Sequence, residues 1–116
     1  MTNPDSRNDP WHEALSCYQS FAEEVITTGS DWPEEFKWSD IGKFFQEGLE
    51  RSTGDWNIRM DVDYFFHEND YTKLIKYLKK YSEYPLVSFP QFQFYTSDRF
   101  HVKTRLCIGV NKKFKK

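Results

Sequence analysis

The first pattern along the chain is a stripe of hydrophobic side chains at helical spacing between residues 10 and 28. Side chains that recur every three or four positions fall on one side of a helix. The stripe comprises Trp11, Ala14, Leu15, Tyr18, Phe21, Ala22, Val25 and Ile26. Asp9 followed by Pro10 is typical of a helix start, because aspartate accepts from the first amides and proline needs no hydrogen bond there. The spacing therefore predicts a helix that ends near Thr28-Gly29.

A second helical pattern follows residues 30–38, which show no periodicity. Ser39 or Asp40 is positioned to cap this helix, and the Ser-Thr-Gly sequence of residues 52–54 to end it. Its predicted buried stripe is Ile41, Phe44, Phe45 and Leu49. Over residues 55–64 apolar side chains instead alternate with polar ones, which predicts a β-strand with one wet face.

Helical spacing returns over residues 71–81 and ends before Pro85, which cannot continue a helix. The stripe of this third helix is Tyr71, Leu74, Ile75, Leu78 and Tyr81. Two alternating segments follow, about residues 86–95 and 99–110, and the short connection between them predicts a hairpin. Pro90 lacks the amide that a ladder needs, so the first of these strands should lie at a sheet edge or carry a bulge there.

The order of these elements indicates an α+β domain. Helices and strands follow one another as α-α-β-α-β-β, and the helices are expected to pack on one face of a small antiparallel sheet. A length of 116 residues suits one ordinary domain. We assign residues 1–9 to a flexible arm, because they are polar and aperiodic, residues 10–111 to the single domain and residues 112–116 to a basic tail.

Composition narrows the class of protein further. Hydrophobic residues make up 38% of the chain, enough for a core, so neither the disordered nor the fibrous class fits. The longest apolar run, residues 106–110, is far shorter than the roughly 20 residues that cross a bilayer. The first residues also lack the apolar stretch of a secretory signal. We therefore expect a cytoplasmic protein with no membrane association.

The net charge of −2 conceals a gradient along the chain. Residues 1–60 hold twelve acidic and five basic side chains, a net charge of −7, whereas residues 61–116 hold six acidic and eleven basic ones, a net charge of +5. Either the two halves face each other and cancel, or the surface is dipolar and steers a charged partner. The sequence leaves both interpretations open.

Aromatic residues reach 19% of the chain, and three of them are concentrated in the segment between the first two helices. Trp32, Phe36 and Trp38 stand there beside Glu34 and Glu35. Rings surrounded by charge are typical of a protein-binding patch, because rings offer contact area at low entropic cost and charges orient the partner. The alternative is that this segment folds down as a lid on the sheet.

The predicted hairpin offers a second candidate surface. If its loop has an even number of residues, Phe94 lies opposite His101, and one face collects Phe92, Phe94, His101, Lys103 and Arg105. Rings that stack on bases beside cations that neutralise phosphates suit single-stranded nucleic acid. An odd count would exchange the two faces.

Two cysteine–histidine pairs are the candidates for nucleophilic catalysis. Cys17 and His12 are five residues apart, and Cys107 and His101 are six apart. Neither spacing holds a thiol within hydrogen-bond distance of an imidazole, as an activated nucleophile requires. The five glycines are isolated, so no phosphate-binding loop is encoded. The two cysteines are expected to be buried thiols.

A metal site is the third chemical candidate. Asp61 and Asp63 share one face of the predicted strand, and His67 follows. Hard divalent ions accept such ligands but need more oxygen atoms than these residues provide. We therefore expect no metal, no cofactor and no enzymatic activity.

These patterns together favour a binding function. We expect a small non-enzymatic protein-binding module, of inhibitor, immunity or adaptor type, whose contact residues are Trp32, Glu34, Glu35, Phe36 and Trp38. The alternative is a nucleic-acid-binding protein that uses the hairpin face. An edge strand and an aromatic-rich hairpin could also pair two copies as a homodimer.

Overall fold

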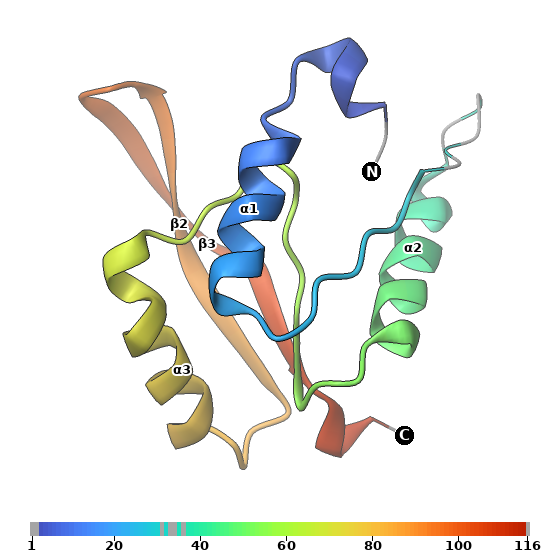
Figure 1. The fold of residues 1–116 in the computed structure, drawn as a ribbon, viewed down its shortest axis with the longest axis vertical. Helices are drawn as coiled ribbons and strands as arrows, with labels where there is room; N and C mark the ends of the chain where they lie inside the picture. The colour runs from blue at the N-terminus through green and yellow to red at the C-terminus, as the bar shows by residue number, and fades with distance from the viewer. Residues whose placement is uncertain (1–2, 31, 33–34, 36, 116) are drawn as a thin grey trace. The chain divides into compact units, whose positions relative to one another are not determined.

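A computed structural model describes residues 3–30, 32, 35 and 37–115, with the backbone alone at residues 104–106 (Figure 1). In chain order its elements are η1 (Pro4–Arg7), α1 (Trp11–Phe21), α2 (Trp38–Arg51), β1 (Trp56–Ile58), η2 (Glu68–Asp70), α3 (Tyr71–Lys80), β2 (Leu86–Thr96), β3 (Arg99–Asn111) and η3 (Lys112–Phe114). The label η marks short 3-10 helices. The predicted α+β class and the predicted order of helices and strands are confirmed.

The chain divides into two compact units, and neither is continuous in sequence. One unit comprises Met1–Gly54 and Met60–Thr72, and the other comprises Asp55–Arg59 and Lys73–Lys116. We call the first the helical unit, since it contains α1 and α2, and the second the sheet unit, since it contains all three described strands. The sheet unit also takes α3 from Lys73 onwards. Each unit is described below by itself.

The sheet is antiparallel, with β3 between β1 and β2. β1 pairs with residues 109–111 at the end of β3, so the rest of the hairpin is a long two-stranded ribbon (Figure 1). β2 lies at the sheet edge, and the register shifts between Phe89 and Gln91, on either side of Pro90. The edge position and the irregularity predicted from this proline are therefore both confirmed.

The base of the hairpin, where β1 joins it, forms a small core. Cys107 is 6% exposed and Asn111 3%. The side-chain amide of Asn111 donates to the carbonyl oxygens of Ser82 and Tyr84, at 2.8 and 3.1 Å. A β-carbon at Gly109 would lie 2.8 Å from a methyl group of β2, so close packing of the strands requires glycine there. This end of the hairpin is thus held by packing and by satisfied polar groups.

α1 ends at Phe21, well before the end predicted near Thr28-Gly29. Ala22 is already extended, with φ −90° and ψ 141°. Residues 25–28 are Val-Ile-Thr-Thr, a run of β-branched side chains that lose rotamer freedom in a helix. The apolar spacing continues past Phe21, but Glu24 and the Thr27 carbonyl bond to the end of α2, and this extended segment leaves the helix already at Ala22.

The predicted helix start is also wrong in detail. Pro10, not Asp9, occupies the N-cap position, and no side chain caps this end. Asp9 instead pairs with Arg7, whose Nε donates to the carboxylate at 2.8 Å. The first residues of the expected arm contain η1, and the Trp11 indole donates to Asp5 at 2.8 Å. The acidic side chains here are therefore satisfied outside the helix.

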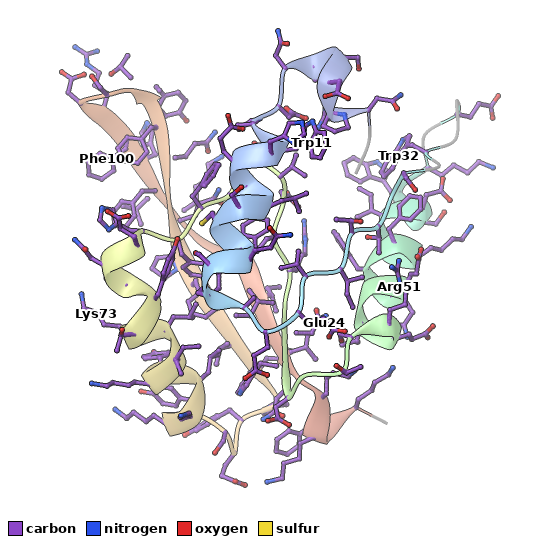
Figure 2. The ribbon with its side chains drawn as sticks, viewed as in Figure 1. Trp11, Glu24, Trp32, Arg51, Lys73 and Phe100 are labelled. Carbon is purple, nitrogen blue, oxygen red and sulfur yellow. The ribbon has the colours of Figure 1, made fainter. Side chains whose placement is uncertain are left out.

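α2 begins at Trp38, ahead of the caps predicted at Ser39 or Asp40, and ends at Arg51 as expected. Of its predicted stripe, Ile41, Phe44 and Leu49 are half-buried and Phe45 is exposed. Polar contacts fix its C-terminal end to the segment after α1: the Arg51 guanidinium donates to the Thr27 carbonyl at 3.1 Å, and the Thr53 amide donates to Glu24 at 2.8 Å (Figure 2).

β1 is much shorter than the strand predicted over residues 55–64. The chain turns after it, and the Tyr64 amide donates to the Asp61 carbonyl at 3.0 Å. The Tyr18 hydroxyl lies 2.6 Å from the carbonyl oxygens of both Asp61 and Tyr64. Tyr18, more than forty positions away in the sequence, thus holds a turn in a segment where alternation alone predicts a strand.

The helical unit has its core around α1. Ala14 is fully buried and Tyr18 is 8% exposed. The Phe21 ring packs edge-on against Phe66 at 5.6 Å and tilted against Tyr71 at 4.7 Å. Aromatic pairs at these distances stabilise a core beyond the area that they bury. The rings of this unit therefore connect segments that are distant in sequence.

α3 confirms the third predicted helix. Leu74 and Leu78 are buried, whereas Ile75, placed in the predicted stripe, is 40% exposed. Lysines on this helix remain in solvent, as expected of a charged helix face. Among the described helices, none is both long enough and apolar enough to span a membrane.

Candidate functional site

The outer part of the β2–β3 hairpin exposes four apolar side chains on one face. Phe94 lies opposite Phe100, and Phe92 lies opposite Val102, so all four point to the same side. The Phe100 ring contacts those of Phe92 and Phe94, with centroids 5.4 and 5.5 Å away. Their exposed fractions lie between 50 and 62%. We call this set the aromatic face; Figure 2 labels Phe100 within it.

The apolar side of the hairpin changes between its base and its outer part. At the base, the odd-numbered positions of β3 are buried, as Cys107 and Asn111 show. In the outer part the odd-numbered positions carry polar side chains, and the even-numbered ones carry the rings. The rings therefore do not continue the core of the sheet unit, and they point away from the side on which it lies.

The opposite face of the outer hairpin is polar and cationic. Gln93 pairs with His101, and Gln91 pairs with Lys103. The Tyr95 ring, 61% exposed, stands edge-on to the His101 ring at 5.3 Å. We call this set, with Tyr95, the polar face.

An open depression of about 350 Å³ lies at the end of the ribbon. Tyr95, Arg99, Phe100 and His101 line it. Three rings and a guanidinium therefore border this open hollow.

The register overturns the single face that an even hairpin count would have assembled. A register shift at Tyr95 precedes the turn at Ser97-Asp98, so Phe94 lies opposite Phe100 and not His101. The predicted nucleic-acid set is divided: Phe92 and Phe94 lie on the aromatic face, and His101 and Lys103 on the polar face. The Arg105 side chain lies outside the described part of the chain.

The aromatic segment before α2 is only partly a surface. Trp32 is half-buried and stacks on Phe44, with ring centroids 5.2 Å apart. Trp38 is 79% exposed at the start of α2, and Glu35 is exposed. Glu34 and Phe36 lie outside the described residues. Trp32 therefore packs against a helix, which differs from the predicted lid on the sheet, and Trp38 faces solvent.

Charge separates between the two units more sharply than between the two halves of the sequence. The helical unit holds fifteen acidic and four basic side chains, a net charge of −11. The sheet unit holds three acidic and twelve basic ones, a net charge of +9. The sharper separation arises because residues 60–72, which contain four acids and no base, belong to the helical unit. Each unit therefore has its own long-range field.

The cysteines serve as small side chains in hydrogen-bonded surroundings. The Cys17 sulfur lies 3.2 Å from the Tyr71 hydroxyl and 3.8 Å from the Phe66 carbonyl oxygen. The hydrogen bond with Cys17 raises the pKa of Tyr71. The Cys107 thiol donates to the Arg59 carbonyl at 3.4 Å. These contacts pair each thiol with a phenol or carbonyl group, neither of which activates a nucleophile as a base does.

The residues weighed for a metal do not form a ligand set. Asp61 and Asp63 lie in the turn after β1, and the His67 Nδ1 accepts from the Asn69 amide at 3.1 Å, capping η2. Across the residues whose positions are described, no group of three His, Cys, Asp or Glu side chains could hold a metal ion.

The residues that sequence reasoning missed as a group are Phe100, Val102, Tyr95 and Arg99. The alternation in the sequence predicts that Phe100 and Val102 lie on one side of a strand. Only the β2–β3 pairing register shows that Phe92 and Phe94 lie on the same side. Comparison with protein-family models, with curated proteins and with solved structures finds no match to this chain. Its function is therefore inferred from its own surface.

Proposed function

We propose that this protein is a non-enzymatic module that recognises another protein, with the aromatic face of the β2–β3 hairpin at the centre of the contact. The observation that carries the proposal is the contiguous set of four apolar side chains, each at least half exposed. Single exposed apolar residues are ordinary on any surface, but contiguous ones mark interaction sites. Rings held by a strand supply contact area with little loss of entropy.

The chemistry of this face favours a protein over a nucleic acid. A surface that binds single strands needs rings and cations side by side. Here the register places His101 and Lys103 on the other face, and Phe92, Phe94 and Phe100 have uncharged neighbours along each strand of their own face. An apolar patch on a partner protein complements such a face without leaving a charge unpaired.

The acidic helical unit supports a role for charge in recognition. Its net charge of −11 attracts a basic surface to this unit, whereas the aromatic face belongs to the sheet unit of net charge +9, so charge supports a contact on the helical unit only. Trp38, 79% exposed on this unit, offers a second ring for contact. In place of the five-residue patch expected from the sequence, we propose the aromatic face as the main contact and Trp38 with Glu35 as a secondary one.

A cytoplasmic location forms part of the same proposal. Its support is that Cys17 and Cys107 are both free thiols, as is usual for proteins of reducing compartments. Fractionation of the native host, followed by detection of the chain with an antibody, tests this location.

The experiment is a pull-down from the native host with matched surface variants. The double variant Phe92→Ser, Phe94→Ser removes the centre of the face, and Leu86→Ser is the control, because Leu86 is 57% exposed on the same strand but at its other end. We expect the double variant to weaken the complex at least about tenfold, and Leu86→Ser to leave it unchanged.

Two outcomes would overturn the proposal. Equal capture of the partner by the double variant means that the aromatic face is not the contact. Loss of the folded circular dichroism spectrum in the double variant means that the rings are structural. Sedimentation equilibrium of both variants also separates a different partner from a second copy, since a homodimer that uses this face dissociates in the double variant only.

A further inference from the structure

We infer that the polar face and tip of the β2–β3 hairpin bind single-stranded nucleic acid. The proposal rests on the rings and cations that the observed register brings together there. They are Tyr95, Arg99, His101 and Lys103. This set shares His101 and Lys103 with the one that an even register would have formed, but its other ring is Tyr95 in place of Phe92 and Phe94.

The geometry provides a stacking platform beside cations. Tyr95 is 61% exposed, and its ring stands at 88° to that of His101, with centroids 5.3 Å apart. Two rings at a right angle leave the flat side of one open to a base while the other borders it. The depression of about 350 Å³ lined by these rings, Phe100 and Arg99 is where a base and its phosphate fit.

The charge of the surroundings specifies the sign of the ligand. The sheet unit carries twelve basic side chains against three acidic ones. On the hairpin the acidic side chain is Asp98, whose carboxylate accepts from the Thr96 hydroxyl at 2.7 Å within the turn. Arg99 and Lys103 are both exposed. A polyanion is therefore attracted, and the rings select one that has bases.

The inference does not depend on the net charge of the whole chain. A chain of net charge −2 and isoelectric point about 5.9 is unlike most nucleic-acid-binding proteins. Here, however, the acidic excess belongs to the helical unit, and the hairpin belongs to the sheet unit. Because salt largely screens charges that lie more than about 10 Å apart, the cations beside a bound strand weigh more than the net charge of the whole chain.

The test measures fluorescence anisotropy of a labelled oligothymidylate of about sixteen nucleotides with the full chain. We expect binding that weakens about tenfold between about 50 and about 200 mM salt, as two or three phosphate contacts require. Tyr95→Ala should weaken binding about tenfold by removing a stacked base. Lys103→Gln should reduce the salt dependence by about one phosphate contact.

Two control variants keep the test specific. Lys43→Gln removes the same charge from the helical unit, and Leu86→Ser changes an exposed apolar side chain at the other end of β2; both should bind within about twofold of the unchanged protein. Inorganic polyphosphate of matched charge is the control ligand, since it has no bases.

The contradicting results are equally definite. No binding at the lower salt concentration overturns the inference, and so does oligothymidylate binding that Tyr95→Ala leaves intact and polyphosphate matches. Equal weakening by Lys43→Gln and Lys103→Gln also overturns it. The protein-binding proposal fails separately, because its measurement is the capture of a partner protein, and Tyr95→Ala and Lys103→Gln leave Phe92 and Phe94 in place.

Discussion

The two ends of the β2–β3 hairpin have opposite characters although the same two strands form both. At the base, Cys107 and Asn111 are buried and β1 adds a third strand. In the outer part the ribbon is two-stranded, and Phe92, Phe94 and Phe100 are at least half exposed. A two-stranded ribbon is marginal by itself, so rings there add little to the stability of the whole. Packing therefore accounts for the residues at the base, and the exposed rings of the outer part are those for which we propose a role in recognition.

The largest expected effect is at the base. Asn111→Ala removes three hydrogen bonds: the side-chain amide donates to the carbonyls of Ser82 and Tyr84, and its Oδ1 accepts from the Lys113 amide. We expect the free energy of unfolding to fall by about 3 kcal/mol, since unsatisfied buried groups cost more than a hydrogen bond contributes. Urea denaturation followed by circular dichroism measures it. A change below about 0.5 kcal/mol would mean that the base is not the stable end.

The second effect extends the same contrast to the helical unit. Trp32→Ala removes a ring stacked on Phe44 and should lower the free energy of unfolding by about 2 kcal/mol, less than for a fully buried tryptophan. Trp38→Ala, at a side chain 79% exposed, should change it by no more than about 0.5 kcal/mol. Thermal and urea denaturation of both variants compares them. Equal losses would place both rings in the core.

The third prediction is a small loss of stability in the outer hairpin, which sharpens the comparison with the base. Phe94→Ser removes an exposed ring that contacts the Phe100 ring on the same hairpin. We expect a loss of about 0.5 kcal/mol, the size of one cross-strand pair. The same urea titration as for Asn111→Ala measures it. A loss as large as that of Asn111→Ala would show that the outer hairpin is part of the core.

The smallest effect appears only in alkaline solution. Because the contact with Cys17 raises the pKa of Tyr71, the folded chain favours the neutral phenol. Its contribution to stability is complete below the ordinary tyrosine pKa near 10 and is lost as the pH rises through the higher folded-state pKa. Tyr71→Phe should therefore show a shallower decline of stability above about pH 10. Tyr84→Phe, at an exposed ring, is the control and should decline as the unchanged protein does.

Local patterns in the sequence predict the local elements well. α3 and both hairpin strands lie where the spacing places them, and Pro90 marks an edge strand and an irregularity. The errors occur where distant contacts or backbone preference decide. Contacts with the end of α2 accompany the extended segment after α1, and the Tyr18 hydroxyl holds a turn where alternation predicts a strand.

The candidate site was predictable as residue types but not as an arrangement. The sequence identifies rings and cations on the two hairpin strands, and it cannot say which of them share a face. That depends on the count of residues through the turn and on the two register shifts, near Pro90 and at Tyr95. The division of charge between the units was hidden for a similar reason, since each unit is assembled from separate stretches of chain.

The register shift at Tyr95 has an evolutionary consequence. In a strand, inserting or deleting one residue turns every later side chain to the other side. Tyr95, however, is the extra residue of a bulge, so its deletion would keep Phe94 opposite Phe100 and would remove one ring from the polar face. Homologues that differ in length here would therefore keep the aromatic face and differ in the polar one, so the two faces are free to diverge separately.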